Sequence, residues 1–366
     1  MPTKPFSRRQ FLRTAAYLGI STSLAHPVLS PLAWAKEQES PRLLSCAQQQ
    51  QQDYLVCADM NGQTQYQFTL PERGHGLAVN PNQDLGLVFS RRPGRYITAF
   101  DPQRGKQLWQ HALPRERHCY GHGCFSADGL LYVSEGDTAS SQGVIGVYQV
   151  DAGLKQIALF SDFGIGPHEI IMHPDQQHLI VAVGGIATQG REMLNLASMA
   201  PRLVYLNRHT GKLVHTVTLG DHLLSIRHLA VATDGTVAMA CQYQGDTDIL
   251  PLLYRHRLTP AMAGEISQGI AVMAAEEDWL RFNDYLGSVA ILDEQIITTS
   301  PRGNGVGRWH KDTGQLLGID NLNDVCGLAV IPHQGVMLTT GTGIIEFQAQ
   351  RQLTPWAWDN HALALV

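Results

Sequence analysis

Five histidines hold the same position in a repeated sequence pattern, and imidazoles placed in this way could bind a metal ion. Each begins, or nearly begins, a short apolar segment that ends at a Pro, Asp or Gly turn. One further copy of the pattern has a cysteine at this position, and another has Gly287. The candidate ligands are His75, His122, His168, His228, Cys326 and His361. Neutral imidazole and thiolate suit iron, copper, zinc or nickel and disfavour magnesium and calcium. We expect a transition metal ion, with iron or copper as the leading candidates.

Charged residues flank the column positions and could take part in ligand binding there. Glu169, Asp284 and Asp324 stand beside column positions and could add a carboxylate ligand or orient a histidine. Arg227, next to His228, would oppose a cation or assist an anionic substrate. The alternative for each of these four is a solvated charge in a loop.

The histidines themselves have three explanations. A single histidine at such a place is usually a hydrogen-bonded structural residue, but five of the 16 histidines of the chain share this register. Converging imidazoles repel one another when protonated, so they favour a bound metal or a bound anion. A catalytic ion takes three or four protein ligands and keeps one position open. The column therefore predicts one off-centre ion or two ions, with an anionic or polar ligand and a purely structural role as the alternatives.

The repeated unit that carries the column is predicted to contain four strands. A second apolar strand follows each copy, and a third strand then leads through a turn such as Asp101–Gly105 or Asn207–Gly211 into a fourth. Four strands at a period of roughly 40–45 residues are typical of a propeller blade. The first-strand copies lie at 74–81, 121–128, 167–174, 227–234, 325–332 and 360–366, with a degenerate copy at 289–294.

The two ends of the chain together supply the seventh four-stranded unit. The segment 361–366 is a first strand with nothing after it, and segments 43–47, 54–59 and 63–70 supply the other three strands of a blade. The sequence thus predicts an all-β, seven-bladed β-propeller of four-stranded blades, closed by one C-terminal and three N-terminal strands, which removes the sheet edges. Inner strands of a propeller run in the same direction, so the column residues should converge on one mouth of the central channel.

Two spacings between copies are long. Segments 186–201 and 263–283 each contain a helix-like run and are expected to be loops that cover a face.

The first residues predict export. Arg8 and Arg9 are followed by Phe11 and Leu12, a weakly apolar stretch and a small-x-small site that ends at Ala35. This pattern is similar to a twin-arginine signal, which is read as an address and removed. We expect residues 1–35 to be the signal peptide, residues 36–366 to form a single propeller domain, and the mature protein to be periplasmic.

Other features limit the function. A formal net charge of −5 with no basic stripe argues against a nucleic-acid partner, and no segment of the mature chain is expected to span a membrane. Six cysteines contain no C-x-x-C pair, and Cys119 and Cys124 could either form a small-loop disulfide or stay free. The motifs of serine hydrolases, P-loop proteins and zinc proteases do not occur.

The signal, the seven-blade closure and the repeats of the type Gly74-His75-Gly76-Leu77-Ala78-Val79 together resemble an uncharacterised bacterial family of twin-arginine-exported propellers. Members of that family are associated with imelysin-like, iron-regulated periplasmic proteins and with a di-haem peroxidase-like protein. The resemblance covers essentially the whole chain. It implies a role in periplasmic iron acquisition beside partner proteins of an iron-uptake system.

The leading hypothesis is therefore a periplasmic metal-binding propeller that serves metal uptake or redox handling. A metal-dependent oxidoreductase acting at the same site is one alternative. A protein-interaction propeller with a structural or anion-binding histidine ring is the other.

Overall fold

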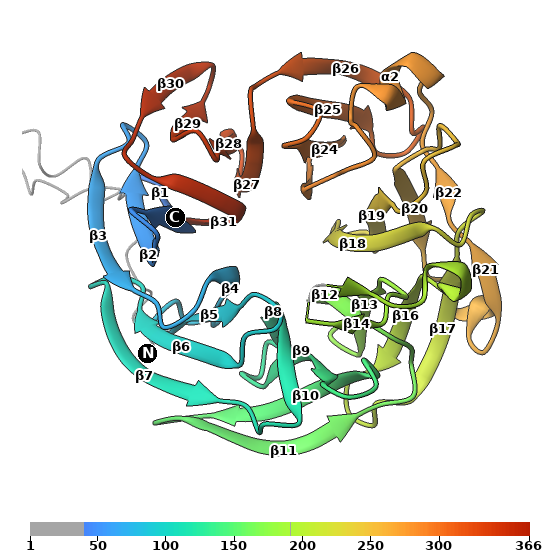
Figure 1. Ribbon diagram of the computed structural model, residues 1–366, viewed down its shortest axis with the longest axis horizontal. Helices are drawn as coiled ribbons and strands as arrows, with labels where there is room; N and C mark the ends of the chain where they lie inside the picture. The colour runs from blue at the N-terminus through green and yellow to red at the C-terminus, as the bar shows by residue number, and fades with distance from the viewer. Residues whose placement is uncertain (1–39, 191) are drawn as a thin grey trace, which may run out of the picture. The chain divides into compact units, whose positions relative to one another are not determined.

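The computed structural model describes residues 40–366 except residue 191, and the predicted signal peptide lies outside the described residues. The chain forms seven blades arranged in a ring, each built on a four-stranded antiparallel sheet (Figure 1). The prediction of an all-β, seven-bladed propeller is confirmed. Among the described residues, no helix has the length and apolar character that crossing a membrane requires.

Each blade runs from an innermost strand at the channel to an outermost strand at the rim. In that order, blade 1 contains β4 (Gly74–Val79), β5 (Gly86–Ser90), β6 (Tyr96–Asp101) and β7 (Lys106–Ala112). Blade 2 contains β8 (Arg117–Phe125), β9 (Leu131–Asp137), β10 (Gly143–Val150) and β11 (Leu154–Phe160). Blade 3 contains β12 (Pro167–Met172), β13 (His178–Val183), β16 (Arg202–Asn207) and β17 (Leu213–Thr218). Blade 4 contains β18 (Leu224–Val231), β19 (Thr236–Tyr243), β20 (Leu253–Arg257) and β22 (Ile270–Ala271).

The remaining blades follow the same order. Blade 5 contains β23 (Ser288–Leu292), β24 (Gln295–Ser300), β25 (Gly305–His310) and β26 (Leu316–Asn321). Blade 6 contains β27 (Val325–Ile331), β28 (Gly335–Thr340), β29 (Ile344–Phe347) and β30 (Gln350–Leu353). Blade 7 contains β31 (Ala357–Leu365), β1 (Arg42–Gln49), β2 (Gln52–Asp59) and β3 (Thr64–Thr69).

Blade 7 closes the ring as predicted. Its inner strand β31 is the last strand of the chain and pairs antiparallel with β1, the first. In Figure 1 the red β31 accordingly lies in one sheet with the blue β1–β3. Each inner strand contacts the inner strand of the next blade, and β31 contacts β4. The inner strands therefore form an unbroken wall around the central channel.

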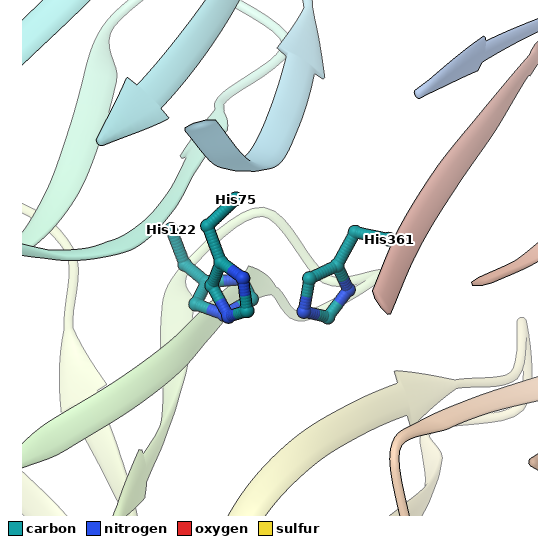
Figure 2. A group of neighbouring side chains, drawn as sticks. All are labelled: His75, His122 and His361. Carbon is teal, nitrogen blue, oxygen red and sulfur yellow. The ribbon is translucent and has the colours of Figure 1, made fainter. Parts of the chain in front are cut away.

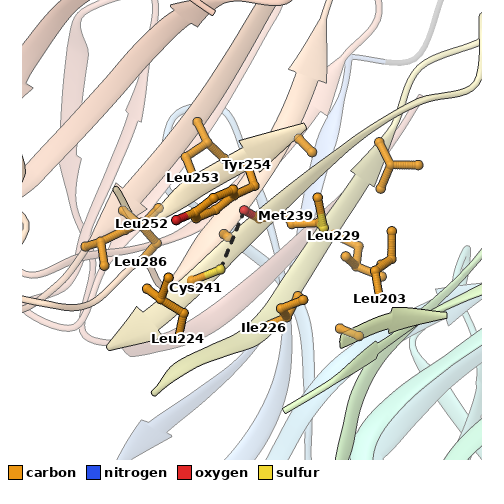
Figure 3. Packing of buried hydrophobic residues seen from close by; sticks show 14 of the residues in the cluster. Leu203, Leu224, Ile226, Leu229, Met239, Cys241, Leu252, Leu253, Tyr254 and Leu286 are labelled. Atoms are coloured by element: carbon orange, nitrogen blue, oxygen red, sulfur yellow. Dashed lines mark hydrogen bonds between the residues drawn. The ribbon is translucent and has the colours of Figure 1, made fainter. Parts of the chain in front are cut away.

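The core lies between adjacent blades. The largest buried cluster joins blades 3, 4 and 5 and includes Leu203, Ile226, Met239 and Trp309, part of which Figure 3 shows. Similar clusters fill the other spaces between blades. Burial of these side chains on both faces of each sheet holds the inner strands in fixed positions.

Glycines in the turns between the third and fourth strands allow blades to approach closely. Gly105 has a φ of +66°, and a Cβ there would lie 2.1 Å from the ring of Tyr66 in the preceding blade. Gly211 has a φ of +69°, and a Cβ there would lie 2.3 Å from Phe160. The glycine of the predicted turn is thus required by its backbone conformation and by its neighbour.

The long segments are more extended than predicted. Where it is described, the first long segment (186–201) holds only the short strands β14 (Thr188–Gln189) and β15 (Glu192–Met193) and the 3₁₀ turn η1 (Leu196–Ser198). In the second segment, β21 (Ile266–Gln268) pairs parallel with β17 of blade 3. The connection between the third and fourth strands of blade 4 is therefore attached to the sheet of blade 3. A helix forms there only over α2 (Glu276–Leu280). All six cysteines are free thiols, and the Cys119–Cys124 disulfide left open by the sequence does not form.

Candidate metal centre

Five histidines from five inner strands converge on the channel axis. Six pairs of their rings have centroids between 4.4 and 4.9 Å apart, and every one of the five rings takes part. Figure 2 shows three of them, on β4, β8 and β31, with their rings turned toward one another. We call this set the histidine cluster; it consists of His75, His122, His168, His228 and His361.

Two overlapping triads within the cluster could each hold a metal ion. His75, His122 and His361 offer ligand atoms that all lie within 4.8 Å of one another, and so do His122, His168 and His228. Three imidazoles around one point would fill three of the four positions of a tetrahedral site and leave the fourth open. His122 belongs to both triads. A neutral imidazole offers one acceptor nitrogen, so the two triads are alternative or combined ligand sets for a single ion.

Irregular strand pairing accompanies the cluster. The register of the inner strand with its neighbour shifts at the column in every blade except blade 5, whose β23 pairs regularly. Such β-bulges bend a strand and redirect a side chain. In blade 1, for example, the shift lies between Gly74 and Leu77 and so brackets His75. The bulges explain how residues of an antiparallel sheet come to point along a shared axis.

Glycines beside the histidines allow the bulged strands to approach. A Cβ on Gly76 would lie 2.9 Å from Nδ1 of His122, and a Cβ on Gly121 would lie 2.6 Å from Cδ2 of His75. Gly121 also has a φ of +98°, which favours glycine. The repeated Gly-His-Gly sequence therefore lets each of these two histidines pack against the backbone that carries the other.

The cluster favours neutral imidazole. His75, His122 and His228 are 3%, 4% and 1% exposed. Burial lowers the pKa of His75 to about 4. Burial and repulsion between the rings hold the pKa values of His122, His168 and His361 well below the ordinary imidazole value. One buried nitrogen of each of the five rings has no hydrogen-bond partner among the described residues. Neutral rings with unsatisfied nitrogens are the form that binds a transition metal.

Two carboxylates approach the cluster from outside. Asp359, which is 5% exposed, accepts a 2.6 Å hydrogen bond from Arg73 and lies 3.6 Å from Nδ1 of His75. Burial is outweighed by the positive charge of Arg73 and contact with His75, so the pKa of Asp359 lies well below its usual range. Glu169 accepts a 2.8 Å hydrogen bond from the backbone N–H of Leu229. Its carboxylate oxygens lie 3.5 Å from Nδ1 of His228 and 3.9 Å from Nδ1 of His122. These separations are longer than hydrogen bonds, so the carboxylates place negative charge beside the rings without satisfying their Nδ1 atoms.

Glu169 was predicted beside the column as a possible orienting carboxylate, and the structure places it there. Asp359 was missed, although its spacing of two from His361 puts both residues on one face of a regular strand. Asp284 and Asp324 belong to neither triad. Burial raises the pKa values of both aspartates, and Asp324 lies against Gly341.

Cys326 shares the column position but not the cluster. Its thiol lies 3.4 Å from the carbonyl oxygen of Trp358 and 3.5 Å from that of Thr339, within the core between blades 6 and 7. Burial raises its pKa to about 12, so it is a protonated thiol rather than a ligand thiolate. The structure therefore does not bring Cys326 into the predicted ligand set.

The cluster separates two hollows of the channel. On one side His75, His168 and His228 line a pocket of about 290 Å³. We call it the arginine pocket, because its lining includes Arg91, Arg92, Arg227 and Arg302. On the other side His122 and His361 line a second cavity of about 350 Å³ with Glu169 and the apolar inner strands. The cluster is thus reached from a basic mouth and backed by a less polar channel.

Comparison with known proteins identifies the fold and the family. The chain is similar to hydrazine synthase of Kuenenia stuttgartiensis, with a TM-score of 0.53 and 13% sequence identity over 71% of this chain and 74% of that chain. At this identity the likeness shows the fold alone. The sequence matches none of the curated proteins. The model of the family described as "Protein of unknown function (DUF1513)" matches residues 68–365, and the chain therefore belongs to the DUF1513 family.

Proposed function

We propose that this protein is a periplasmic metal-binding propeller in which the histidine cluster holds one iron or copper ion. The observation that carries the proposal is the convergence of five buried imidazoles in two triads that share His122. Leaving five buried ring nitrogens unsatisfied costs roughly 1–3 kcal/mol each, and coordination of a metal removes that cost.

The chemistry of the donor atoms limits which metal ions the cluster can bind. All five donors are imidazole nitrogens, which suit iron, copper, zinc or nickel and bind magnesium or calcium poorly. Asp359 and Glu169 provide compensating negative charge behind His75 and His228. They are placed as outer carboxylates that strengthen the basicity of the rings.

The cellular role that we propose is metal uptake or redox handling, with iron as the leading cargo. The twin-arginine pattern supports export of the folded chain after the metal has been inserted. The resemblance to propellers associated with imelysin-like proteins supports a place beside the protein partners of a periplasmic iron-uptake system.

A metal-dependent oxidoreductase is the second candidate, and one observation favours it. The arginine pocket opens onto three of the five histidines, so a small molecule held there would lie beside an open coordination position. Turnover of a small-molecule electron donor by the metal-loaded protein, and not by the metal-free protein, would distinguish this role from storage or transfer.

The test is a titration of metal-free mature protein with Fe(II) under anaerobic conditions, and with Cu(I) and Cu(II), in competition with a chromophoric chelator. We expect saturation at about one ion per chain and loss of binding in His122→Ala. His222→Ala, an exposed histidine outside the cluster, is the matched control and should bind as the wild type does. Equal binding by wild type and His122→Ala, or no binding by folded wild type, would refute the proposal.

A further inference from the structure

The arginine pocket has a composition that fits an anion. Eight residues besides the three histidines line it, and the described lining contains no Asp or Glu. They come from blades 1, 2, 4, 5 and 7: Arg91, Arg92, Tyr120, Arg227, Gln242, Tyr285, Arg302 and Asn360. Guanidinium groups gathered from three different blades create a local positive field, because the described lining itself contributes no carboxylate.

Several donors in this pocket are unused. Tyr120 is 3% exposed, and its buried hydroxyl has no hydrogen-bond partner among the described residues. The buried Nε of Arg227 likewise has none, and within residues 40–366 no ion pair joins Arg227 to a carboxylate. Tyr285 accepts a 3.3 Å hydrogen bond from Asn360 and keeps its own proton to donate. Arg302 stacks on the ring of Tyr285 at 4.5 Å, which holds its guanidinium at the rim.

The charge of Arg227 persists at neutral pH. A guanidinium is not deprotonated in proteins, and the Nε of Arg227 is buried. A buried guanidinium without an anionic partner is unfavourable, and a bound anion with oxygen acceptors removes that penalty.

We propose that the arginine pocket binds a small di- or tricarboxylate. A guanidinium pairs with a carboxylate through two parallel hydrogen bonds, and arginines on three blades require carboxylates at more than one end of the ligand. The volume of about 290 Å³ lies near the lower limit of small-molecule pockets, roughly 300–1,000 Å³. A single phosphate or sulfate would leave most of this space to water.

The position of the pocket gives the ligand a second role. Because His75, His168 and His228 form part of the same lining, one carboxylate oxygen would reach the open coordination position of the metal. This part of the inference rests on the proposed function. It identifies the cargo as a metal that arrives, or leaves, as its carboxylate complex, and it explains why guanidinium groups surround a cation site.

Calorimetric titration of the metal-free mature protein with tricarballylate, a tricarboxylate that binds metals weakly, tests the first part. We expect binding that weakens as ionic strength rises. Arg227→Gln and the more exposed Arg302→Gln should each weaken it by roughly 10–100-fold. Arg104→Gln, whose side chain pairs with Asp101 in a distant turn, is the matched control and should leave binding unchanged. Circular dichroism establishes that each variant is folded.

Three results would overturn the carboxylate assignment: no binding by folded wild type, equal weakening in Arg104→Gln, or phosphate and sulfate binding as tightly as tricarballylate. The metal titration is run on the same preparation. Metal binding without carboxylate binding refutes only this inference, and carboxylate binding without metal binding refutes only the proposed metal site. When both are present, the metal-loaded protein should bind tricarballylate more tightly and with a change in its metal absorption spectrum; unchanged affinity and spectrum would refute the shared coordination.

Discussion

At the scale of single residues, His122 is central to the proposed metal site. It is the residue that both triads share, and it lies behind the histidines that line the arginine pocket. Because His122 belongs to both triads and the other four histidines belong to one each, the five are not equivalent as candidate ligands, although they occupy equivalent positions of the repeat. His75 and His168 each belong to one triad, so loss of either one leaves the other triad intact.

We therefore predict a graded response to alanine substitution. His75→Ala and His168→Ala should keep about one ion per chain with lower affinity, because three histidines still suffice for a site. His122→Ala should lose more affinity than either, by at least about 100-fold. Competition titrations of the three variants measure the order. Equal losses in all three would contradict the shared-ligand arrangement.

The outer carboxylates provide a second prediction at this scale. Asp359→Asn removes the negative charge between Arg73 and His75 but keeps the size of the side chain. Metal affinity should fall by roughly 10–100-fold with the stoichiometry unchanged. Asp320→Asn, 72% exposed on the outer strand of blade 5, is the control and should have no effect on affinity. Unchanged affinity in Asp359→Asn would mean that the aspartate supports only the fold.

At the scale of elements, the inner strands aim their histidines through bulges and glycines. The alignment of the repeats predicted which residue of each strand would face the channel, because equivalent strands of a propeller are related by rotation. It could not predict the bulges, which depend on pairing with the second strand. The alignment also did not predict the position of Cys326, which has the column register and a register shift like those of the histidine strands, yet turns its thiol into the space between blades 6 and 7.

The arginine pocket was also only partly foreseen. Arg227 was predicted because it adjoins His228. Arg91 and Arg302 follow the ends of the second strands β5 and β24. In an antiparallel blade the end of the second strand lies beside the start of the first, so these residues reach the same mouth. The sequence around Arg91 and Arg302 does not indicate that they lie near the histidines. Only the pairing of the strands in the folded blade brings them to the site.

Gly121→Ala tests the role of the bulged strands. The substitution introduces a Cβ at a φ of +98°, 2.6 Å from the ring of His75. Unfolding free energy should fall by about 1–3 kcal/mol, and metal affinity should fall with it because His75 is displaced. Gly129→Ala is the matched control: its φ is +85° and no atom lies within 4 Å of the added Cβ. It should lose stability in urea unfolding but bind metal normally. Normal metal binding by Gly121→Ala would contradict the account of how His75 is positioned.

At the scale of the whole molecule, closure by β31 and β1 makes the ring of inner strands continuous. The sequence predicted this closure because the last segment repeats the first-strand pattern, whereas three strands at the other end lack a first strand. It did not predict that β21 would leave blade 4 and pair with blade 3, because a short exposed strand carries little pattern. Because the inner strands form one closed ring, protonation of the histidine cluster should lower the free energy of unfolding of the whole propeller.

The metal-free protein should consequently lose stability in acid. The pKa of His75 falls to about 4 on folding, and those of His122, His168 and His361 are also lowered. Above about pH 6.5 these rings are neutral in both states; below it the unfolded chain binds protons that the folded chain does not. Unfolding free energy should fall as pH drops from about 6.5 to 4, by up to about 1.4 kcal/mol per pH unit for each ring. Urea unfolding across this range measures the slope, and a flat profile would contradict it.

The most direct test of the central claim is elemental analysis of the mature protein, exported through its own signal and purified without a histidine tag or a chelator. The account predicts near-stoichiometric iron or copper, which is lost in His122→Ala while the circular dichroism spectrum of the propeller is retained. Absence of a transition metal from folded wild type, after both cytoplasmic loading and reconstitution under periplasmic conditions, would contradict the claim that the histidine cluster is a metal site.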